Sequence, residues 1–342
     1  MKWRMLNKGL IKLCWFILLS ICIQTLSAQD STDVDDLLFA STNRIVWIDQ
    51  VPALKQDTEK KKKGWFKNLI LGDKEIKSIQ KPVYILTEKE NTKIILDQGH
   101  GTLFLSEDQK LSIPKVIKKK DYEFPSLVAA CLLPGNELLF TDSSKEHIYH
   151  FSSNRKEISI FNEALQLKQP TGIAYSKKTN QIWVVETGVH QISILDLSGK
   201  KIKSFGKRGS KEGEFNFPTS IWIDQDGLVY IVDALNFRIQ IFDAEGNFIS
   251  MFGKNGNGTG FMASPKGIAT DSHGNIYVVD ALFHAVQIFD KQGNYLYQFG
   301  KQGRRTEEFW MPTGIFIDEK DQIYVVDSYN SRIQIFELKY QE

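Results

Sequence analysis

A repeat of 47 residues constrains this chain more than any other feature. Three segments that start at Pro218, Pro265 and Pro312 align with almost no adjustment, and weaker copies start at Pro170, Pro125 and Pro82. One acidic residue recurs in every copy, at steps of 45, 44, 47, 47 and 47 residues: Asp97, Asp142, Glu186, Asp233, Asp280 and Asp327. The chain therefore contains six repeats, and a repeat of this length indicates an architecture of stacked units.

Each repeat has the pattern of short β-strands. Its runs are four to six residues long, are rich in Ile, Val, Tyr and Phe, and are bounded by Gly, Asp and Asn. The second run, such as residues 276–280, is almost wholly apolar and needs cover on both faces. Blades that pack against each other supply this cover, and a period of 40 to 50 residues is typical of propellers. We predict an all-β fold, a six-bladed β-propeller of four-stranded antiparallel blades over residues 82–342.

The last repeat is one strand short. After residues 332–338 it has no counterpart of residues 248–252, whereas residues 44–48 (RIVWI) form an unassigned strand near the N-terminus. We predict that this N-terminal strand completes the last blade and closes the ring, because closure removes two exposed sheet edges.

The repeat pattern is Pro-x-Gly-Ile, then Ile-Tyr-Val-x-Asp, then Arg-Ile-Gln-x-Phe. It resembles the NHL repeat, with a strong match from residue 170 onward, and suggests a bacterial exported member of that family. The resemblance implies a propeller with a central channel, in a family whose members mostly bind other macromolecules or small ligands.

Residues 1–28 have the pattern of a signal peptide. Four basic residues precede an apolar run of 11 residues at 13–23, and small residues follow at 27 and 28. Such a run is too short to span a bilayer and fits a signal-peptide core. We expect an exported protein, periplasmic or secreted, with lipoprotein anchoring at Cys22 as the less favoured alternative because Ile21 precedes it.

Residues 29–81 are predicted to hold the closing strand and a basic insertion. Residues 59–63 (EKKKK) precede Trp65, Phe66, Leu69 and Ile70, which recur at helical spacing. We interpret the insertion as a solvated loop and a short amphipathic helix on the propeller. In the alternative interpretation, residues 59–70 make a peripheral contact with a membrane surface.

Charge and cysteine content exclude several classes of protein. Loss of residues 1–28 leaves 39 basic and 41 acidic residues, a net charge of −2 that gives no support for a nucleic-acid partner. Only Cys131 then remains, so the fold has no internal disulfide, and its apolar surroundings predict a buried, inert thiol. We expect a monomer.

The six repeated acidic residues are predicted to be structural. An Asp at the end of a strand caps the following turn, and Arg238 and Arg332 stand five residues after Asp233 and Asp327. A role repeated in every blade is structural, since an enzyme needs one asymmetric site, and we assign no catalytic residue. Motifs for a serine hydrolase, a zinc protease or a phosphate loop are absent from the sequence.

Function is therefore sought in the loops that differ between blades, which a propeller gathers on one face. We predict an exported scaffold that binds a protein or ligand through this top face, where the partner is an envelope protein or extracellular ligand with acidic character. No cofactor is expected. The candidate contacts are Lys207, Arg208, Phe237, His284, Arg304, Arg305 and Tyr329.

The alternative is a metal-dependent lyase or hydrolase. His190 and His284 hold the same register two blades apart, and with His100 they form a candidate site for a divalent metal at the central channel. Residues 281–284 (ALFH) resemble a zinc-binding loop of the peptide-amidating lyases, which also place a histidine directly after a blade-starting proline. None of those positions is histidine in this chain, so that activity is not assigned: Val83, Ser126, Thr171, Thr219, Lys266 and Thr313.

Overall fold

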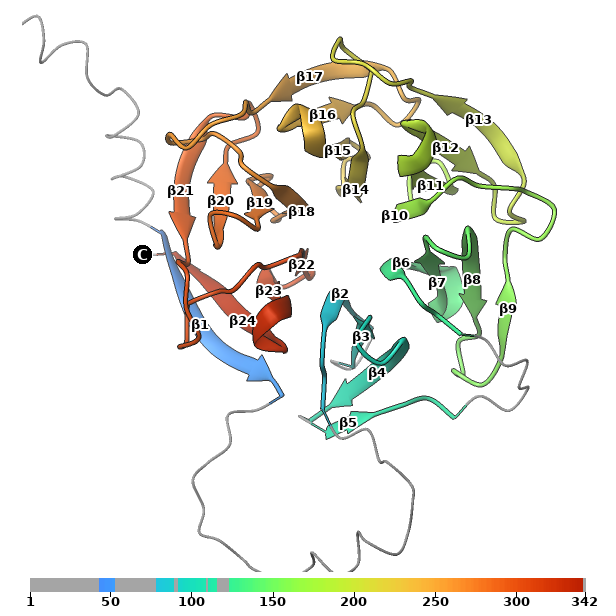
Figure 1. Cartoon of the computed structure of the whole chain (residues 1–342), viewed down its shortest axis with the longest axis horizontal. Helices are drawn as coiled ribbons and strands as arrows, with labels where there is room; N and C mark the ends of the chain where they lie inside the picture. The colour runs from blue at the N-terminus through green and yellow to red at the C-terminus, as the bar shows by residue number, and fades with distance from the viewer. Residues whose placement is uncertain (1–42, 53–77, 89–91, 109, 116–122, 341–342) are drawn as a thin grey trace, which may run out of the picture.

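The computed structural model describes residues 43–52, 78–88, 92–108, 110–115 and 123–340. These residues form six four-stranded antiparallel sheets, which stand as blades around a common axis (Figure 1). The predicted all-β, six-bladed propeller is therefore confirmed. The predicted signal peptide, Cys22 and the segment at 59–70 lie outside the described residues.

The first five blades follow the chain from the axis outward, so the innermost strand of each blade comes first. Their strands are, in blade one, β2 (Pro82–Thr87), β3 (Lys93–Asp97), β4 (Thr102–Glu107) and β5 (Lys110–Ser112); in blade two, β6 (Leu127–Leu133), β7 (Glu137–Asp142), β8 (His147–Phe151) and β9 (Ile158–Ile160); in blade three, β10 (Pro170–Ser176), β11 (Gln181–Glu186), β12 (Gln191–Leu195) and β13 (Lys201–Phe205); in blade four, β14 (Pro218–Ile223), β15 (Val229–Asp233), β16 (Arg238–Phe242) and β17 (Phe248–Phe252); in blade five, β18 (Pro265–Thr270), β19 (Ile276–Asp280), β20 (Ala285–Phe289) and β21 (Tyr295–Phe299).

Blade six joins the two ends of the described chain. It contains β22 (Gly314–Ile317), β23 (Gln322–Asp327), β24 (Arg332–Tyr340) and, as its outermost strand, β1 (Asn43–Val51). β1 pairs antiparallel with β24, with Trp47 opposite Phe336 and Val51 opposite Ile333. The predicted closure of the ring by an N-terminal strand is confirmed, and it covers the edge that β24 would otherwise expose.

The hydrophobic core lies between the blades. Every residue of β15 and of β19 is buried, as expected for strands covered on both faces. Between blades five and six, Tyr277 and Ile288 pack in one cluster with Ile315 and Phe336. Cys131 is buried in the cluster between blades two and three, and burial raises the pKa of its thiol. The predicted inert cysteine is thus a core residue.

Short helices and tight turns join the strands. Four single-turn 3-10 helices occur in the described chain: η2 (Pro134–Asn136), η3 (Thr187–Val189), η4 (Ala234–Asn236) and η5 (Ser328–Asn330). The turns at Gly227, Gly246 and Gly293 have φ of 85°, 85° and 83°, a left-handed conformation that glycine adopts without strain. No helix among the described residues is long and apolar enough to span a membrane.

Candidate binding face

One end of the ring, called here the top face, carries two kinds of loop. The first kind follows the second strand of each blade and includes η3, η4 and η5. The second kind joins one blade to the next, at residues 206–217, 253–264 and 300–313. Hydrogen bonds connect the two kinds, from Leu235 N to Asn216 O at 3.0 Å and from Tyr329 N to Trp310 O at 3.2 Å. The top face is therefore a continuous surface of loops held by the blades.

The repeated carboxylate of blade six ties these loops together. Asp327 is fully buried, and its Oδ2 accepts hydrogen bonds from Arg332 Nε at 2.7 Å and Asn330 Nδ2 at 2.9 Å. Its Oδ1 accepts a hydrogen bond from the backbone N–H of Trp310 at 2.8 Å. Asp233 makes the equivalent contacts in blade four, with Arg238 Nε at 2.8 Å. Each of these buried charges has a counter-charge and hydrogen-bond donors, as burial requires.

Of the other four repeated acids, three bond to backbone N–H groups and Glu186 also bonds to side chains. Asp97, Asp142 and Asp280 accept hydrogen bonds from backbone N–H groups that precede the innermost strand and from those of the following turn. Glu186 accepts from the backbone of Lys168 at 2.8 Å, from Ser193 Oγ, and from Lys201 Nζ at 3.1 Å. All six carboxylates are thus engaged in holding a turn against a neighbouring loop.

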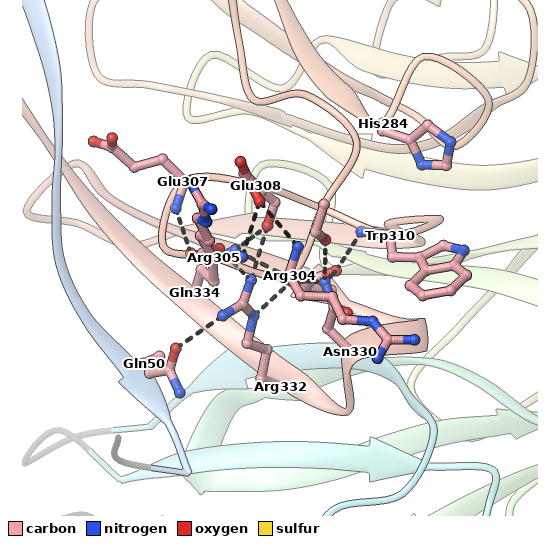
Figure 2. Close-up of polar contacts among 12 residues, drawn as sticks. Gln50, His284, Arg304, Arg305, Glu307, Glu308, Trp310, Asn330, Arg332 and Gln334 are labelled. Carbon is pink, nitrogen blue, oxygen red and sulfur yellow. Dashed lines mark hydrogen bonds and ion pairs between the residues drawn. The ribbon is translucent and has the colours of Figure 1, made fainter. Parts of the chain in front are cut away.

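The Arg332 side chain also donates hydrogen bonds to the loop between blades five and six. Its Nη2 donates to the carbonyl oxygens of Arg305 at 2.7 Å and Glu308 at 2.9 Å, and its Nη1 donates to Gln50 Oε1 at 3.3 Å (Figure 2). Gln50 belongs to β1, so the closing strand and the top-face loop share one buried arginine. Arg238 binds the carbonyl oxygens of residues 210, 211 and 214 in the same way.

The loop at 300–313 displays the predicted arginines. The Glu308 carboxylate accepts hydrogen bonds from the backbone N–H groups of Arg305 and Arg304 at 3.0 and 3.1 Å, and these bonds hold the pKa of Glu308 below its usual value. The Arg304 guanidinium lies over the Trp310 ring, 4.5 Å from its centroid (Figure 2). This loop therefore exposes cationic side chains, while the Glu308 carboxylate accepts hydrogen bonds from the backbone of the same loop.

The other predicted contacts lie on the same face with different exposure. Lys207, Arg208 and Arg305 are exposed, and Lys207 Nζ lies 3.3 Å from Glu214 Oε1. Tyr329 is 59% exposed. Phe237 differs, because it has a left-handed φ of 55° and packs partly against the core cluster of blades four and five. Most of the candidate contacts are accessible, whereas much of the Phe237 ring is covered.

The three histidines of the metal hypothesis are not brought together as ligands. His190 Nδ1 accepts a hydrogen bond from Phe217 N at 2.9 Å, and His284 Nδ1 accepts one from Met311 N at 3.0 Å. His100 Nε2 contacts the carbonyl oxygen of Ser78 at 3.2 Å. Burial and then the nearby Arg208 lower the pKa of His190. The shared register of His190 and His284 thus reflects a repeated contact with the next loop. Over the described ranges, no group of three or more His, Cys, Asp or Glu side chains is arranged to hold a metal ion.

Apart from Tyr329, sequence reasoning missed an arc of exposed apolar side chains on the turns of four consecutive blades. These side chains are Val189 (38% exposed), Leu235 (50%), Leu282 (56%) and Tyr329 (59%). Leu235, Leu282 and Tyr329 each stand two residues after the repeated acid, and Val189 stands three after it. Apolar residues at a turn position normally occupied by polar ones were the available signal. We call these four residues the turn arc.

The chain is similar to known proteins over part of its length. A family model described as a 6-bladed beta-propeller matches residues 224–284 and 266–342. The human E3 ubiquitin-protein ligase NHLRC1 is 32% identical over 68 residues, which are 20% of this chain and 17% of the ligase. The chain is a six-bladed β-propeller. This propeller spans about a sixth of the length of the curated relatives that it matches, and the rat protein gives 31% identity over the same length.

Solved structures share the propeller's fold at low identity. Virginiamycin B lyase from Staphylococcus aureus has a TM-score of 0.56 and 14% identity, over 76% of this chain and 96% of the lyase. An auxiliary nutrient binding protein from Bacteroides thetaiotaomicron has a TM-score of 0.61 and 14% identity, over 76% and 70%. A gluconolactonase from Xanthomonas campestris has a TM-score of 0.60 and 12% identity, over 77% and 88%. Because both enzymes and a binding protein have this fold, function must be argued from the site.

Proposed function

We propose that this propeller is an exported binding module that takes an acidic, partly apolar segment of a protein partner on its top face. The turn arc is the observation that carries the proposal. Four apolar side chains stand on the equivalent turns of blades three to six, and three of them are at least half exposed. Exposed apolar side chains that gather on one face of a domain are typical of an interaction site.

Exposed positive charge on the top face favours an acidic partner. Arg208 and Arg305 are exposed and make no ion pair with any residue in the described part of the chain. Glu308 bonds to the backbone of its own loop, which reduces its capacity to neutralise these arginines. An acidic segment would pair with the unneutralised guanidinium groups, while apolar residues beside its acids contact the turn arc.

The test compares two triple variants that remove similar apolar area. The first is Leu235→Ser/Leu282→Ser/Tyr329→Ser on the turn arc. The control is Ile202→Ser/Ile249→Ser/Met251→Ser on β13 and β17, where exposure is 50%, 50% and 44%. Peptides are selected from a random displayed library against the wild-type propeller, and their affinities for all three proteins are measured by fluorescence anisotropy.

We expect the selected peptides to be enriched in Asp and Glu beside large apolar residues. The Leu235→Ser/Leu282→Ser/Tyr329→Ser variant should bind these peptides at least ten-fold more weakly than the wild type, because interface energy is concentrated in a few large side chains. The outer-strand control should bind the peptides with the affinity of the wild type. Added salt should weaken peptide binding to the wild type and to this control. Selection of no peptide, or equal affinity for the turn-arc variant, would overturn the proposal.

A further inference from the structure

Two asparagine–glycine pairs stand in the top-face loop at 253–264, which joins β17 to β18 (Figure 1). They are Asn255-Gly256 and Asn257-Gly258. An asparagine followed by glycine is chemically labile, because the backbone nitrogen of the glycine can attack the side-chain amide without hindrance from a side chain of its own. The reaction requires that this nitrogen be accessible and free of a hydrogen bond. The two pairs differ on this criterion.

The Asn255-Gly256 pair is held by the second half of the loop. Asn255 forms an isolated parallel bridge with Met262. Met262 N donates to the carbonyl oxygen of Lys254 at 2.9 Å, and Gly256 N donates to that of Met262 at 3.4 Å. The Phe261 ring also packs against Gly256, where an added Cβ would collide with it. The nitrogen that would attack the Asn255 side chain is therefore engaged in a hydrogen bond.

The Asn257-Gly258 pair is exposed and its attacking nitrogen is free. The Gly258 N–H makes no hydrogen bond with the described residues, although the Gly258 carbonyl oxygen accepts one from Phe261 N at 3.0 Å. Asn257 and Gly258 are both exposed, and a Cβ added at Gly258 would find neighbours only at 3.7 Å. The Gly258 nitrogen therefore meets both requirements of the reaction.

A glutamate occupies the equivalent nitrogens of the two neighbouring loops. Lys211 and Arg305 stand 47 residues before and after Gly258. Lys211 N donates to Glu214 Oε2 at 3.1 Å, and Arg305 N donates to Glu308 Oε2 at 3.0 Å. The loop between them has a phenylalanine at the glutamate position, residue 261, and its ring has no carboxylate oxygen to accept the same bond.

The backbone at the glutamate position is anchored alike in all three loops. A buried glutamine of the third strand donates from its Nε2 to the carbonyl oxygen of that position. The donor and acceptor pairs are Gln240 and Glu214 at 2.8 Å, Gln287 and Phe261 at 2.8 Å, and Gln334 and Glu308 at 2.7 Å. The missing carboxylate is therefore a side-chain difference on a shared framework.

We infer that Asn257 is a site of spontaneous deamidation in the folded propeller. The Gly258 nitrogen forms a bond to Asn257 Cγ, and the bond between Cγ and Nδ2 breaks. The Gly258 nitrogen gives up its proton and ammonia leaves, so that a cyclic succinimide results. Water then adds to either carbonyl of the succinimide, and the product is aspartate or isoaspartate. No oxidant or reductant takes part.

The reaction places a carboxylate where the top face had a neutral amide. It lies in the same loop as Lys254, whose Nζ is over the Phe261 ring, 4.1 Å from the ring centroid. The new charge makes the top face less positive, which opposes an acidic partner. The modification itself does not rest on the proposed function, because it requires only Asn257, Gly258 and water.

The test follows the purified protein during incubation in warm neutral buffer. Deamidation replaces an NH₂ group by an OH group, and tandem mass spectrometry assigns the resulting mass gain to Asn255 or Asn257. The folded protein is compared with the same protein in urea. Two variants are also compared: Phe261→Glu supplies the glutamate of the neighbouring loops, and Phe261→Leu removes the ring without supplying a carboxylate.

We expect Asn257 of the folded protein to deamidate at least ten-fold faster than Asn255. In urea the two residues should react at similar rates, because each is then followed by glycine in an unfolded chain. Phe261→Glu should slow the reaction at Asn257 several-fold, since the carboxylate accepts a hydrogen bond from Gly258 N–H. Phe261→Leu should not slow it.

A converse variant tests the same protection in a loop that keeps its own glutamate. Ser210→Asn/Lys211→Gly places the labile pair beside Glu214, whose carboxylate accepts the hydrogen bond from the backbone of residue 211. The introduced amide should deamidate at least several-fold more slowly than Asn257 in the same molecule. This comparison serves even where Phe261→Glu fails to fold.

Three outcomes would overturn the inference. The first is equal deamidation of Asn255 and Asn257 in the folded protein, and the second is deamidation of Asn257 only after unfolding. The third is a rate at residue 210 of the converse variant that equals the rate at Asn257. Each outcome is read from mass alone, so it is separable from failure of the proposed function, which is read from peptide binding.

Discussion

Equivalent residues of the six repeats perform related but different tasks. Asp327 accepts hydrogen bonds from the side chains of Arg332, Asn330 and Gln334, whereas Asp280 accepts only from backbone N–H groups. The arginine position of blade five is Ala285. The ring therefore stabilises its buried carboxylates in two ways, by an ion pair with an arginine or by hydrogen bonds from several backbone N–H groups.

The ion pair predicts that Asp327 and Arg332 are strongly coupled in their contributions to the free energy of unfolding. Asp327→Ala leaves a buried guanidinium without its counter-charge and should lower the free energy of unfolding by about 3–5 kcal/mol. The Asp327→Ala/Arg332→Ala double variant should cost less than the sum of the single variants by roughly 1–3 kcal/mol. Urea denaturation of the four proteins measures this difference.

The control cycle pairs Asp327→Ala with Arg238→Ala, which has the same role two blades away. These two losses should add to within about 0.5 kcal/mol, because the residues share no contact. Additivity in the Asp327 and Arg332 cycle would contradict a coupled pair.

At the scale of an element, β1 is the strand that makes the ring closed. It pairs with β24 along its whole length, with one irregularity between Trp47 and Asp49. Val51 packs in the cluster between blades six and one, and Gln50 accepts a hydrogen bond from Arg332. The strand thus links the sheet, the core and the top-face network, although it is far in sequence from all three.

Removal of β1 should destabilise the ring as a whole. We expect a variant without residues 1–52 to melt at least about 10 °C below the wild type, since it loses an edge strand and part of the core. A synthetic peptide of residues 43–52 should restore much of the Tm when added in excess, because binding to the folded state stabilises it. A variant without residues 1–41 keeps β1 and serves as the control. Equal Tm values for the two truncated proteins would contradict this role.

At the scale of the whole molecule, the blades meet most closely near the axis. A Cβ added at Gly172 would lie 2.9 Å from Ile221 N in the next blade, and one added at Gly314 would lie 2.9 Å from Val83 O. These contacts are with backbone, so a side chain there cannot be relieved by a rotamer change. The glycine of the Pro-x-Gly-Ile motif thus sets the spacing between blades.

This spacing predicts a cost for Gly267→Ala. The added methyl group would press on the backbone of β22, and the blades must separate to admit it. We expect a loss of about 1–3 kcal/mol in the free energy of unfolding, measured in urea. Gly258→Ala is the matched control, because its Cβ would find neighbours only at 3.7 Å. Equal stability of the two variants would refute a spacing role for this glycine.

The sequence by itself determined the number of blades, the order of their strands and the closing strand. These follow from local patterns, since alternation, turn residues and a repeated period are properties of neighbouring residues. The Asp–Arg pairs at 233 and 238 and at 327 and 332 also lie within one repeat. The tertiary structure decided what residues of different blades do together. It showed that His190 and His284 bond to the next loop. It also showed that Leu235 and Leu282 stay exposed, because contacts across blades depend on how the ring brings the repeats together.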